Sequence, residues 1–251
     1  MADGSLSCCS TSSGCCDTSE VLRSPIESSQ TVGYNQNDLD SIPHSSILGL
    51  GCGNPSTFAH LKEGDVVVDL GSGAGIDVFI AANIVKDKGK VIGVDITDAM
   101  LDKARKNAEI NDYQNVEFRK GDIEEKIPVD DNSVDVVISN CVINLTGNKL
   151  NTFKEIHRIL KPNGVGRLII SDVVTTREIE KTLVNEANWC DCVDGALTKE
   201  NYLDSIRKAG FGNVEILEER TSNVVEDFKE HGEKNTRNIT SLTIKAFKDS
   251  I

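Results

Sequence analysis

Eight cysteines are the residues of this 251-residue chain that most directly indicate chemistry. They are Cys8, Cys9, Cys15, Cys16, Cys52, Cys141, Cys190 and Cys192. Structural disulfides are rare in a reducing compartment, so this many thiols there would indicate metal or metalloid binding, or redox catalysis. The two adjacent pairs near the start are either incidental thiols of a mobile tail, or they bind soft metals or relay electrons.

Three separate segments carry the remaining thiols. Cys52 lies among closely spaced glycines before an Asn-Pro step, which excludes a regular helix and leaves its sulfur poorly shielded, so we favour a functional thiol there. Cys141 directly follows a predicted strand over 134–139, and Cys190 and Cys192 lie on a predicted insertion. Ligands of an open parallel sheet bind at the carboxyl ends of its strands, where Cys141 is expected, and an insertion after the fifth strand normally covers that same side.

The number of thiols bears on what they bind. Structural zinc takes four ligands, usually from paired CxxC motifs, and no CxxC motif occurs here. Zinc stays an alternative because scattered ligands can also assemble. A soft trivalent centre matches three thiolates better, and it keeps a lone pair on its open face that can act as a nucleophile.

A glycine-rich loop is the second chemical signal. The apolar strand Val66–Leu70 runs into Gly71, Gly73 and Gly75, and the apolar residues that follow have helical spacing. This GxGxG spacing differs from the GxGxxG of dinucleotide-binding folds. Asp69, two positions before the first glycine, would repel a phosphate but suits the ammonium of an amino-acid group. A structural turn in another α/β protein is the alternative.

Acidic residues after the next two strands fit a nucleoside. Asp95 ends a strand about 20 residues after the glycine loop, where a carboxylate commonly binds ribose hydroxyls. Met100 either makes apolar contact beneath the nucleoside or packs in the core. Asp122 either accepts a hydrogen bond from an adenine amino group or caps a helix.

The elements that must position these residues alternate between strand and helix. We predict strands over 66–70, 90–95, 115–119, 134–139, 167–172, 214–219 and 240–247, with a polar helix or loop around 226–234. Residues 1–38 are expected to be a flexible tail that contains cysteines, because Ser, Thr, Gly, Asn and Asp dominate there. Residues 39–251 are expected to form one α/β domain, with an insertion around 176–198.

Composition excludes several classes of partner. With 27 basic against 40 acidic residues the formal net charge is −13, which disfavours nucleic acid and acidic membrane surfaces. No run of 18 apolar residues occurs, and the first 20 residues lack the basic and apolar regions of a secretory signal. We therefore expect a cytoplasmic protein that acts on a small molecule.

Five motifs together resemble those of the arsenite S-adenosylmethionine methyltransferases, a family of class I methyltransferases. The motifs are LGLGCGNP at 48–55, DLGSGAG at 69–75, GVDIT at 93–97, SNCVINL at 139–145 and CVDGAL at 192–197. The resemblance extends from about Asp38 to about Phe211. It implies a Rossmann-like sheet of seven mostly parallel strands, the last one antiparallel, with helices on both faces.

The resemblance also implies a set of site residues. Cys52, Cys141 and Cys192 would bind trivalent arsenic and serve the reaction directly, while Cys190 is additional. The residues that would bind S-adenosylmethionine are Asp69, Gly71, Ser72, Gly73, Gly75, Asp95, Ile96, Met100, Gly121, Asp122, Ile123 and Asn140. Arsenite and methylarsenite would be the substrates, with a thiol reductant such as thioredoxin or glutathione as partner, in arsenic detoxification.

The hypothesis is a direct displacement in which the arsenic lone pair attacks the methyl carbon of the sulfonium. No general base is needed, and catalysis would come from holding the reactants about 3 Å apart and in line while excluding water. Two rivals stay open. One is a methyltransferase acting on carbon or oxygen of a small metabolite; the other is a thiol-rich metal-binding protein without catalysis.

Overall fold

The computed structural model describes residues 23–179, 184, 189–190, 192–228 and 234–249. Its helices and short 3-10 turns are α1 (Pro25–Thr31), α2 (Gln36–Asp40), η1 (His44–Ser46), α3 (Pro55–Phe58), α4 (Ile76–Val85), α5 (Asp98–Ile110), η2 (Ile143–Leu145), α6 (Lys149–Ile159) and α8 (Lys199–Lys208). Its strands are β1 (Val66–Leu70), β2 (Lys90–Asp95), β3 (Val116–Lys120), β4 (Val136–Asn140), β5 (Arg167–Thr175), β6 (Phe211–Phe228) and β7 (Lys234–Lys248).

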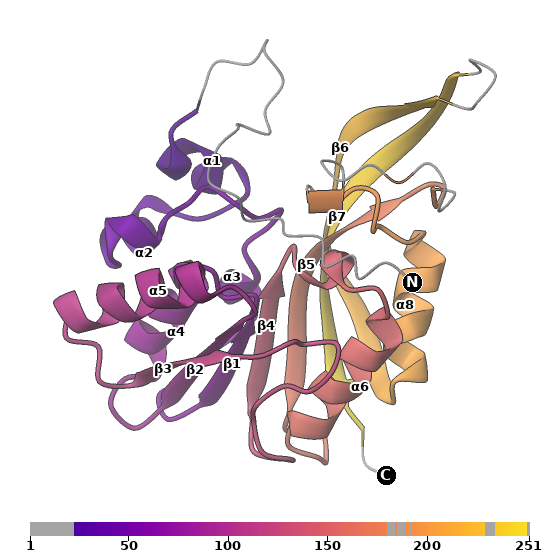
Figure 1. The fold of residues 1–251 in the computed structure, drawn as a ribbon. Coiled ribbons are helices and arrows are strands. Elements are labelled where there is room, and N and C mark those ends of the chain that lie inside the picture. Colours follow the sequence, from indigo (N-terminus) through magenta and orange to yellow (C-terminus); the bar gives the residue numbers. More distant parts are fainter. Residues whose placement is uncertain (1–22, 180–183, 185–188, 191, 229–233, 250–251) are drawn as a thin grey trace.

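The strands described form a single seven-stranded sheet in the order β3-β2-β1-β4-β5-β7-β6 (Figure 1). Strands β1 to β5 pair in parallel, and β7 is antiparallel to both β5 and β6. Parallel strands are covered on both faces and therefore read as continuous apolar runs, as β1 and β4 do. The predicted sheet, with its last strand antiparallel, is confirmed.

Helices cover both faces of the sheet. Helices α4 and α5 lie on one face and α6 and α8 on the other (Figure 1). Successive strand residues point to opposite faces, so Val67 joins the core beneath α4 and α5 while its neighbour Val68 joins the core beneath α6 and α8. Each face thus has its own apolar cluster, and the sheet separates the two.

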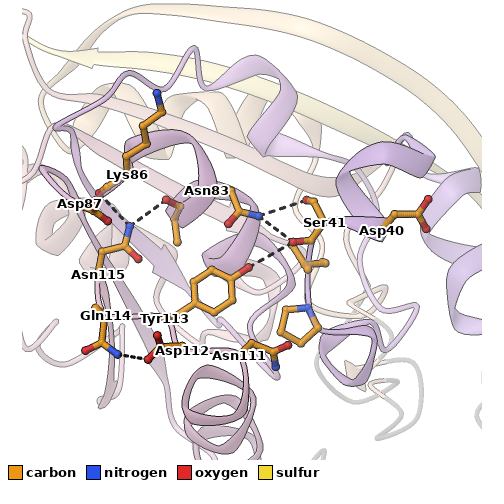
Figure 2. Close-up of a pocket in the computed structure, with 13 residues that line it drawn as sticks. Asp40, Ser41, Asn83, Lys86, Asp87, Asn111, Asp112, Tyr113, Gln114 and Asn115 are labelled. Atoms are coloured by element: carbon orange, nitrogen blue, oxygen red, sulfur yellow. Dashed lines mark hydrogen bonds between the residues drawn. The ribbon is translucent and has the colours of Figure 1, made fainter.

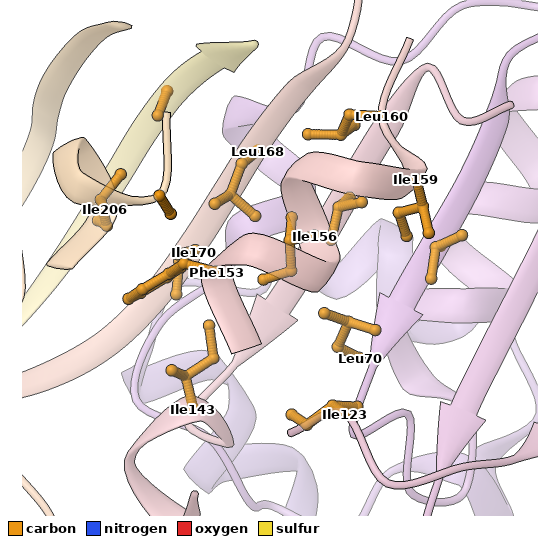
Figure 3. Close-up of a cluster of buried hydrophobic side chains, with 14 of the residues drawn as sticks. Leu70, Ile123, Ile143, Phe153, Ile156, Ile159, Leu160, Leu168, Ile170 and Ile206 are labelled. Carbon is orange, nitrogen blue, oxygen red and sulfur yellow. The ribbon is translucent and has the colours of Figure 1, made fainter. Parts of the chain in front are cut away.

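The cluster beneath α6 and α8 is built around aromatic and branched side chains (Figure 3). Phe153 and Ile156 of α6 pack there with Leu70 of β1 and Ile170 of β5, and all four are fully buried or nearly so. The ring of Phe153 meets that of Tyr202 on α8 edge to face, with 5.6 Å between centroids. This packing fixes the two helices against the sheet, below the ends of β4 and β5.

The last two strands are longer than predicted. The pairing of β7 with β5 ends at Ile239, opposite Thr175, while its pairing with β6 continues to Lys234 opposite Phe228. The two strands thus extend beyond the sheet as a ribbon (Figure 1). The prediction of a helix or loop from residue 226 is wrong for 226–228, because this polar ribbon lacks the apolar alternation of a strand with one buried face.

The expected boundary at residue 38 is placed too late in the chain. Ser24 and Glu27 form a capping box that starts α1, and the following turn buries Tyr34 at 3% exposure and Leu39 at 1%. A short polar segment can join a domain when a few large side chains reach its core, which composition alone does not reveal. The predicted tail otherwise falls on residues 1–22, outside those described, as do its four cysteines.

Within the described ranges no helix is both long and apolar enough to cross a membrane.

Truncating Phe153 to alanine is expected to destabilise the protein by about 3 to 5 kcal/mol, because a large buried ring leaves a cavity between α6 and α8. Denaturant unfolding followed by circular dichroism measures this. Val165→Ala, at a side chain that is 52% exposed, serves as control and should change the unfolding free energy by less than about 0.5 kcal/mol. Equal effects of the two variants would contradict the assignment of Phe153 to the core.

Candidate functional site

The glycine loop joins β1 to α4 at the carboxyl end of the sheet. Gly71, Gly73 and Gly75 all have positive φ angles, of 70°, 51° and 100°. The backbone N–H groups of Gly71 and Ser72 donate to the carbonyl of Val94, at 2.8 and 3.1 Å. The loop is thereby fixed across the end of the neighbouring strand β2, and α4 begins immediately after Gly75.

Two of these glycines serve different purposes. A Cβ atom at Gly71 would lie 2.2 Å from a methyl carbon of Val142, so the missing side chain allows the segment after β4 to pack against the loop. A Cβ at Gly73 would meet nothing within 4 Å. The loop therefore has one side closed by protein and one side open to a ligand.

Two carboxylates flank the loop. Asp95 accepts hydrogen bonds from the backbone N–H of Gly73 and of Thr97, both at 2.8 Å, so its oxygens are held at the open side. Asp69 is 3% exposed, and burial, with the negative charges of Asp77 and Asp95, raises its pKa well above the ordinary value. A cation placed beside Asp69 would relieve this unfavourable concentration of negative charge.

Ser72 tests whether a nucleoside-type cofactor fits this loop. Its hydroxyl oxygen is buried and has no hydrogen-bond partner in the part of the chain that the structure describes. Buried polar atoms are rarely left unpaired, so an unpaired one beside an open glycine marks a place for a polar ligand group. The loop and its flanking acids therefore fit a cofactor that carries hydroxyl groups and a cation.

The thiols gather at the same end of the sheet, beyond the end of β4 and beside β5. The sulfurs of Cys52 and Cys141 and a carboxylate oxygen of Asp172 all lie within 4.8 Å of one another. The Cys192 thiol donates to the backbone carbonyl of Cys141 at 2.8 Å. These three cysteines carry thiols rather than disulfides, whereas Cys190 is disulfide-bonded and so offers no thiolate.

Two of the three thiol-bearing residues have an unusual backbone. Cys141 and Cys192 have φ angles of 59° and 65°, in the left-handed region that favours glycine. A non-glycine residue there costs about 1 to 2 kcal/mol. Backbone hydrogen bonds from Cys141 to Ser171 and from Cys192 to Trp189, at 2.8 and 2.9 Å, hold the two turns. Six other described non-glycine residues also have positive φ, so the backbone alone does not distinguish these two cysteines.

The surroundings of Cys52 and Cys141 favour the protonated form of both thiols. A hydrogen bond from Cys141 favours the thiolate of Cys52, but burial and the charge of Asp172 outweigh it and raise the pKa of Cys52. For Cys141, a hydrogen bond from Cys192 lowers the pKa, whereas its interaction with Cys52, burial and nearby negative charge raise it well above the ordinary value. A ligand that bonds to these two sulfurs would therefore have to displace the thiol protons.

Asp172, which ends the predicted fifth strand, is a site residue that sequence reasoning missed. Its carboxylate accepts four hydrogen bonds at 2.9 to 3.2 Å, two of them from Asn144 and one each from Val173 and Tyr202. Burial raises its pKa to about 6, so the group is mostly ionised at pH 7.5. An acid at the carboxyl end of a central strand was the available signal.

Asn140 ties the Cys52 loop to β4. Its amide nitrogen donates to the carbonyl of Gly53 at 2.7 Å and to the Tyr34 hydroxyl at 3.0 Å, and its amide oxygen accepts from the backbone N–H of Cys52 at 3.0 Å. Tyr34 in turn donates to the buried Asp77 at 2.7 Å. The amide of Asn140 is thus engaged by protein, and contact of this residue with a cofactor stays a prediction.

The other predicted cofactor residues differ in exposure and in their hydrogen-bond partners. Ile96 is 60% exposed beside Asp95, and Met100 is half-buried in the first turn of α5. The Asp122 carboxylate accepts from the backbone N–H of Glu124 at 2.8 Å within a turn, and no helix follows directly, so Asp122 is not a helix cap. The backbone N–H of Gly121 donates to the backbone carbonyl of Asp95, and Ile123 packs in the core beneath α6.

A cavity of about 610 Å³ lies elsewhere, near α2 and the end of α4 (Figure 2). Its lining includes 86–87, which precede β2, and 111–115, which precede β3, so it lies at the amino ends of those strands. Its polar side chains mostly bond to protein: Asn83 and Tyr113 both donate to the carbonyl of Ser41. This cavity is remote from the thiols and the glycine loop.

Residues 61–210 match a family model described as a methyltransferase domain. The chain is 45% identical over 205 residues to an arsenite methyltransferase of Halobacterium salinarum, covering 81% of this chain and 50% of that protein. It is 34% identical over 154 residues to an arsenite methyltransferase of Homo sapiens, covering 58% of this chain and 40% of that protein. The chain thus spans about half the length of the curated relatives it matches.

A solved structure supports the same comparison. The crystal structure of CrArsM, an arsenic(III) S-adenosylmethionine methyltransferase from Chlamydomonas reinhardtii, aligns with a TM-score of 0.68 at 30% identity. The alignment covers 91% of this chain and 75% of that one.

Substituting alanine at Gly71 should destabilise the fold by about 2 kcal/mol or more, because the new Cβ meets Val142 in a backbone already at positive φ. Gly73→Ala shares the backbone strain of about 1 to 2 kcal/mol but meets no atom. Thermal unfolding should therefore place Gly71→Ala below Gly73→Ala in stability. The reverse order would show that the segment after β4 does not pack on the loop.

Removing the charge of Asp172 should lower the pKa of the Cys141 and Cys52 thiols, because that charge disfavours both thiolates. Asp172→Asn is expected to speed alkylation of both cysteines by iodoacetamide at pH 8, by about threefold for each pKa unit that the thiol falls, because the thiolate fraction rises while each thiolate becomes less nucleophilic. Asp87→Asn, at an exposed residue after α4, removes an equal charge as control. Unchanged rates in a folded Asp172→Asn variant would contradict the electrostatic coupling.

Proposed function

This chain belongs to the methyltransferase domain family, and from that premise we propose that it transfers a methyl group from S-adenosylmethionine to trivalent arsenic bound by Cys52, Cys141 and Cys192. The observation that carries the proposal is the meeting of thiols from separate segments beside the glycine loop. The names of its relatives add support, since both curated relatives described above are arsenite methyltransferases.

The donor side of the proposal rests on the glycine loop and its acids. S-adenosylmethionine supplies a methyl group on a positively charged sulfur. The buried Asp69 is suited to the ammonium of its methionine part, and Asp95, held by Gly73 and Thr97, is suited to its ribose hydroxyls. The unpaired Ser72 hydroxyl offers one further polar contact beside the open face of Gly73.

The acceptor side rests on the chemistry of three thiols. Arsenite carries three hydroxyl groups, and each As–S bond that forms releases one of them as water with the proton of the thiol. The raised pKa values of Cys52 and Cys141 suit this exchange, because each thiol arrives with the proton that the leaving hydroxide needs. Arsenic held by three sulfurs is pyramidal, and its lone pair is free to attack carbon.

We extend the proposal to the setting of the reaction. Methylated arsenicals would be the products and methylarsenite a second substrate, with the outcome being arsenic detoxification in the cytoplasm. Transfer of the methyl group releases S-adenosylhomocysteine and raises arsenic to the pentavalent state. Two of the three cysteines would return two electrons to arsenic by forming a disulfide, and a thiol reductant such as thioredoxin or glutathione would reduce that disulfide.

The test combines labelled methyl donor, arsenite and glutathione, and follows methylated arsenic by chromatography. We expect methylation by the unmodified protein and a loss of about 100-fold or more for Cys52→Ser, Cys141→Ser or Cys192→Ser, since a hydroxyl is a poor ligand for a soft centre. Binding of S-adenosylhomocysteine, measured by calorimetry, should stay unchanged in the three variants. Absence of methylated arsenic from the unmodified protein would refute the proposal.

The opposite pattern is expected for Asp69→Asn. This variant should bind arsenite normally but bind the methyl donor more weakly, because only an ionised carboxylate attracts an ammonium. For the same reason, binding of the donor to the unmodified protein should strengthen as the pH rises through the raised pKa of Asp69. A methyltransferase of a small metabolite would retain much activity in Cys141→Ser. A metal-binding protein without catalysis would bind arsenite and leave the donor intact.

A further inference from the structure

Three alternate residues of β7 face the thiol-bearing loops. Arg237, Ile239 and Ser241 are buried, at 1%, 4% and 8% exposure, whereas Asn238 between them is exposed. Residues two apart on a strand share one face of the sheet, so these three form a single strip. The strip lies where β7 leaves β5 and continues with β6 into the ribbon (Figure 1).

One end of the strip holds the loop that carries Cys192. The guanidinium of Arg237 donates to the Asp194 carboxylate and, at 3.1 Å, to the backbone carbonyl of Val193. Both side chains of the ion pair are fully buried. A buried ion pair is weak evidence for stability, yet removing one partner is strongly destabilising, so the pair fixes where this loop lies.

The other end of the strip holds the loop that carries Cys52. The hydroxyl of Ser241 donates to the backbone carbonyl of Cys52 at 2.6 Å. Between the two ends, Ile239 packs in one apolar cluster with Cys192, and Cys52 and Cys141 contact that cluster. One strand face thus touches the immediate neighbours of Cys192 and the backbone of Cys52.

We propose that the Arg237–Ile239–Ser241 face of β7 is a positioning brace that fixes the distance between the Cys52 and Cys192 loops and so sets the three-thiol geometry. The inference rests on the proposed function and adds to it residues that do not themselves bind arsenic. Loops need such a brace because their conformational freedom would otherwise have to be removed by the ligand as it binds.

The test measures each thiol separately. Alkylation of Cys52, Cys141 and Cys192 by iodoacetamide is followed by mass spectrometry in the absence of arsenite, for Arg237→Met, Ser241→Ala and the control Asn238→Ala. Local opening governs the alkylation of buried thiols, so Arg237→Met should speed reaction of Cys192 by about tenfold or more and leave Cys52 nearly unchanged. Ser241→Ala should speed Cys52 selectively, because opening of the loop outweighs the rise in the Cys52 pKa that follows loss of the Ser241 hydroxyl. Asn238→Ala should change neither.

Binding of arsenite gives the second readout, through the fluorescence of Trp189, the single tryptophan, which lies one residue before Cys190. Arg237→Met and Ser241→Ala should each weaken arsenite binding by about tenfold, while binding of S-adenosylhomocysteine stays unchanged. Should Arg237→Met fail to fold, Arg237→Lys, which keeps the charge but cannot form the same pair of directed bonds, replaces it.

The outcomes separate the brace from the proposed function. Equal acceleration of all three thiols, or none in folded variants, would overturn the brace. Loop-specific acceleration in a protein that shows no binding of arsenite by Trp189 fluorescence would uphold the brace and overturn the proposed substrate.

Discussion

The parallel pairing of β1 with β4 is the constraint on which the candidate site depends. Leu70 lies opposite Ser139 in this pairing, so Gly71 and Asn140, one residue further along each strand, emerge side by side. The absent side chain of Gly71 then admits Val142, and the turn at Cys141 is held against the glycine loop. Backbone hydrogen bonds, rather than long side chains, fix the cofactor loop and this thiol relative to each other.

Much of this arrangement could be predicted from sequence. The apolar strands predicted a parallel sheet, since both faces of such a sheet are covered, and the GxGxG loop with Asp69 and Asp95 predicted the type of cofactor. The fold and the family are confirmed. The structure also brings Cys52 and Cys141 together and places Cys192 against Cys141. The roles of these residues as ligands stay predictions.

The contacts that position the site could not be predicted, because they join distant parts of the chain. Tyr34 reaches Asp77, 43 residues away, and Ser241 reaches Cys52 across 189 residues. Neither Tyr34 nor Ser241 lies in a motif. Asp172 differs, since the predicted strand ended at this acid, which was a readable signal, although the strand itself continues to Thr175.

The separation of the thiols along the chain has a consequence for the durability of the protein. Cys52 lies 88 residues before Asn140, and Cys141 lies 51 residues before Cys192. A ligand bonded to all three sulfurs would act as a three-way cross-link that closes two large rings, and each such closure removes about 4 kcal/mol of conformational freedom from an unfolded chain. Loading with such a ligand would then slow digestion by proteases, and a chain cut between two of the sulfurs would still hold its pieces together.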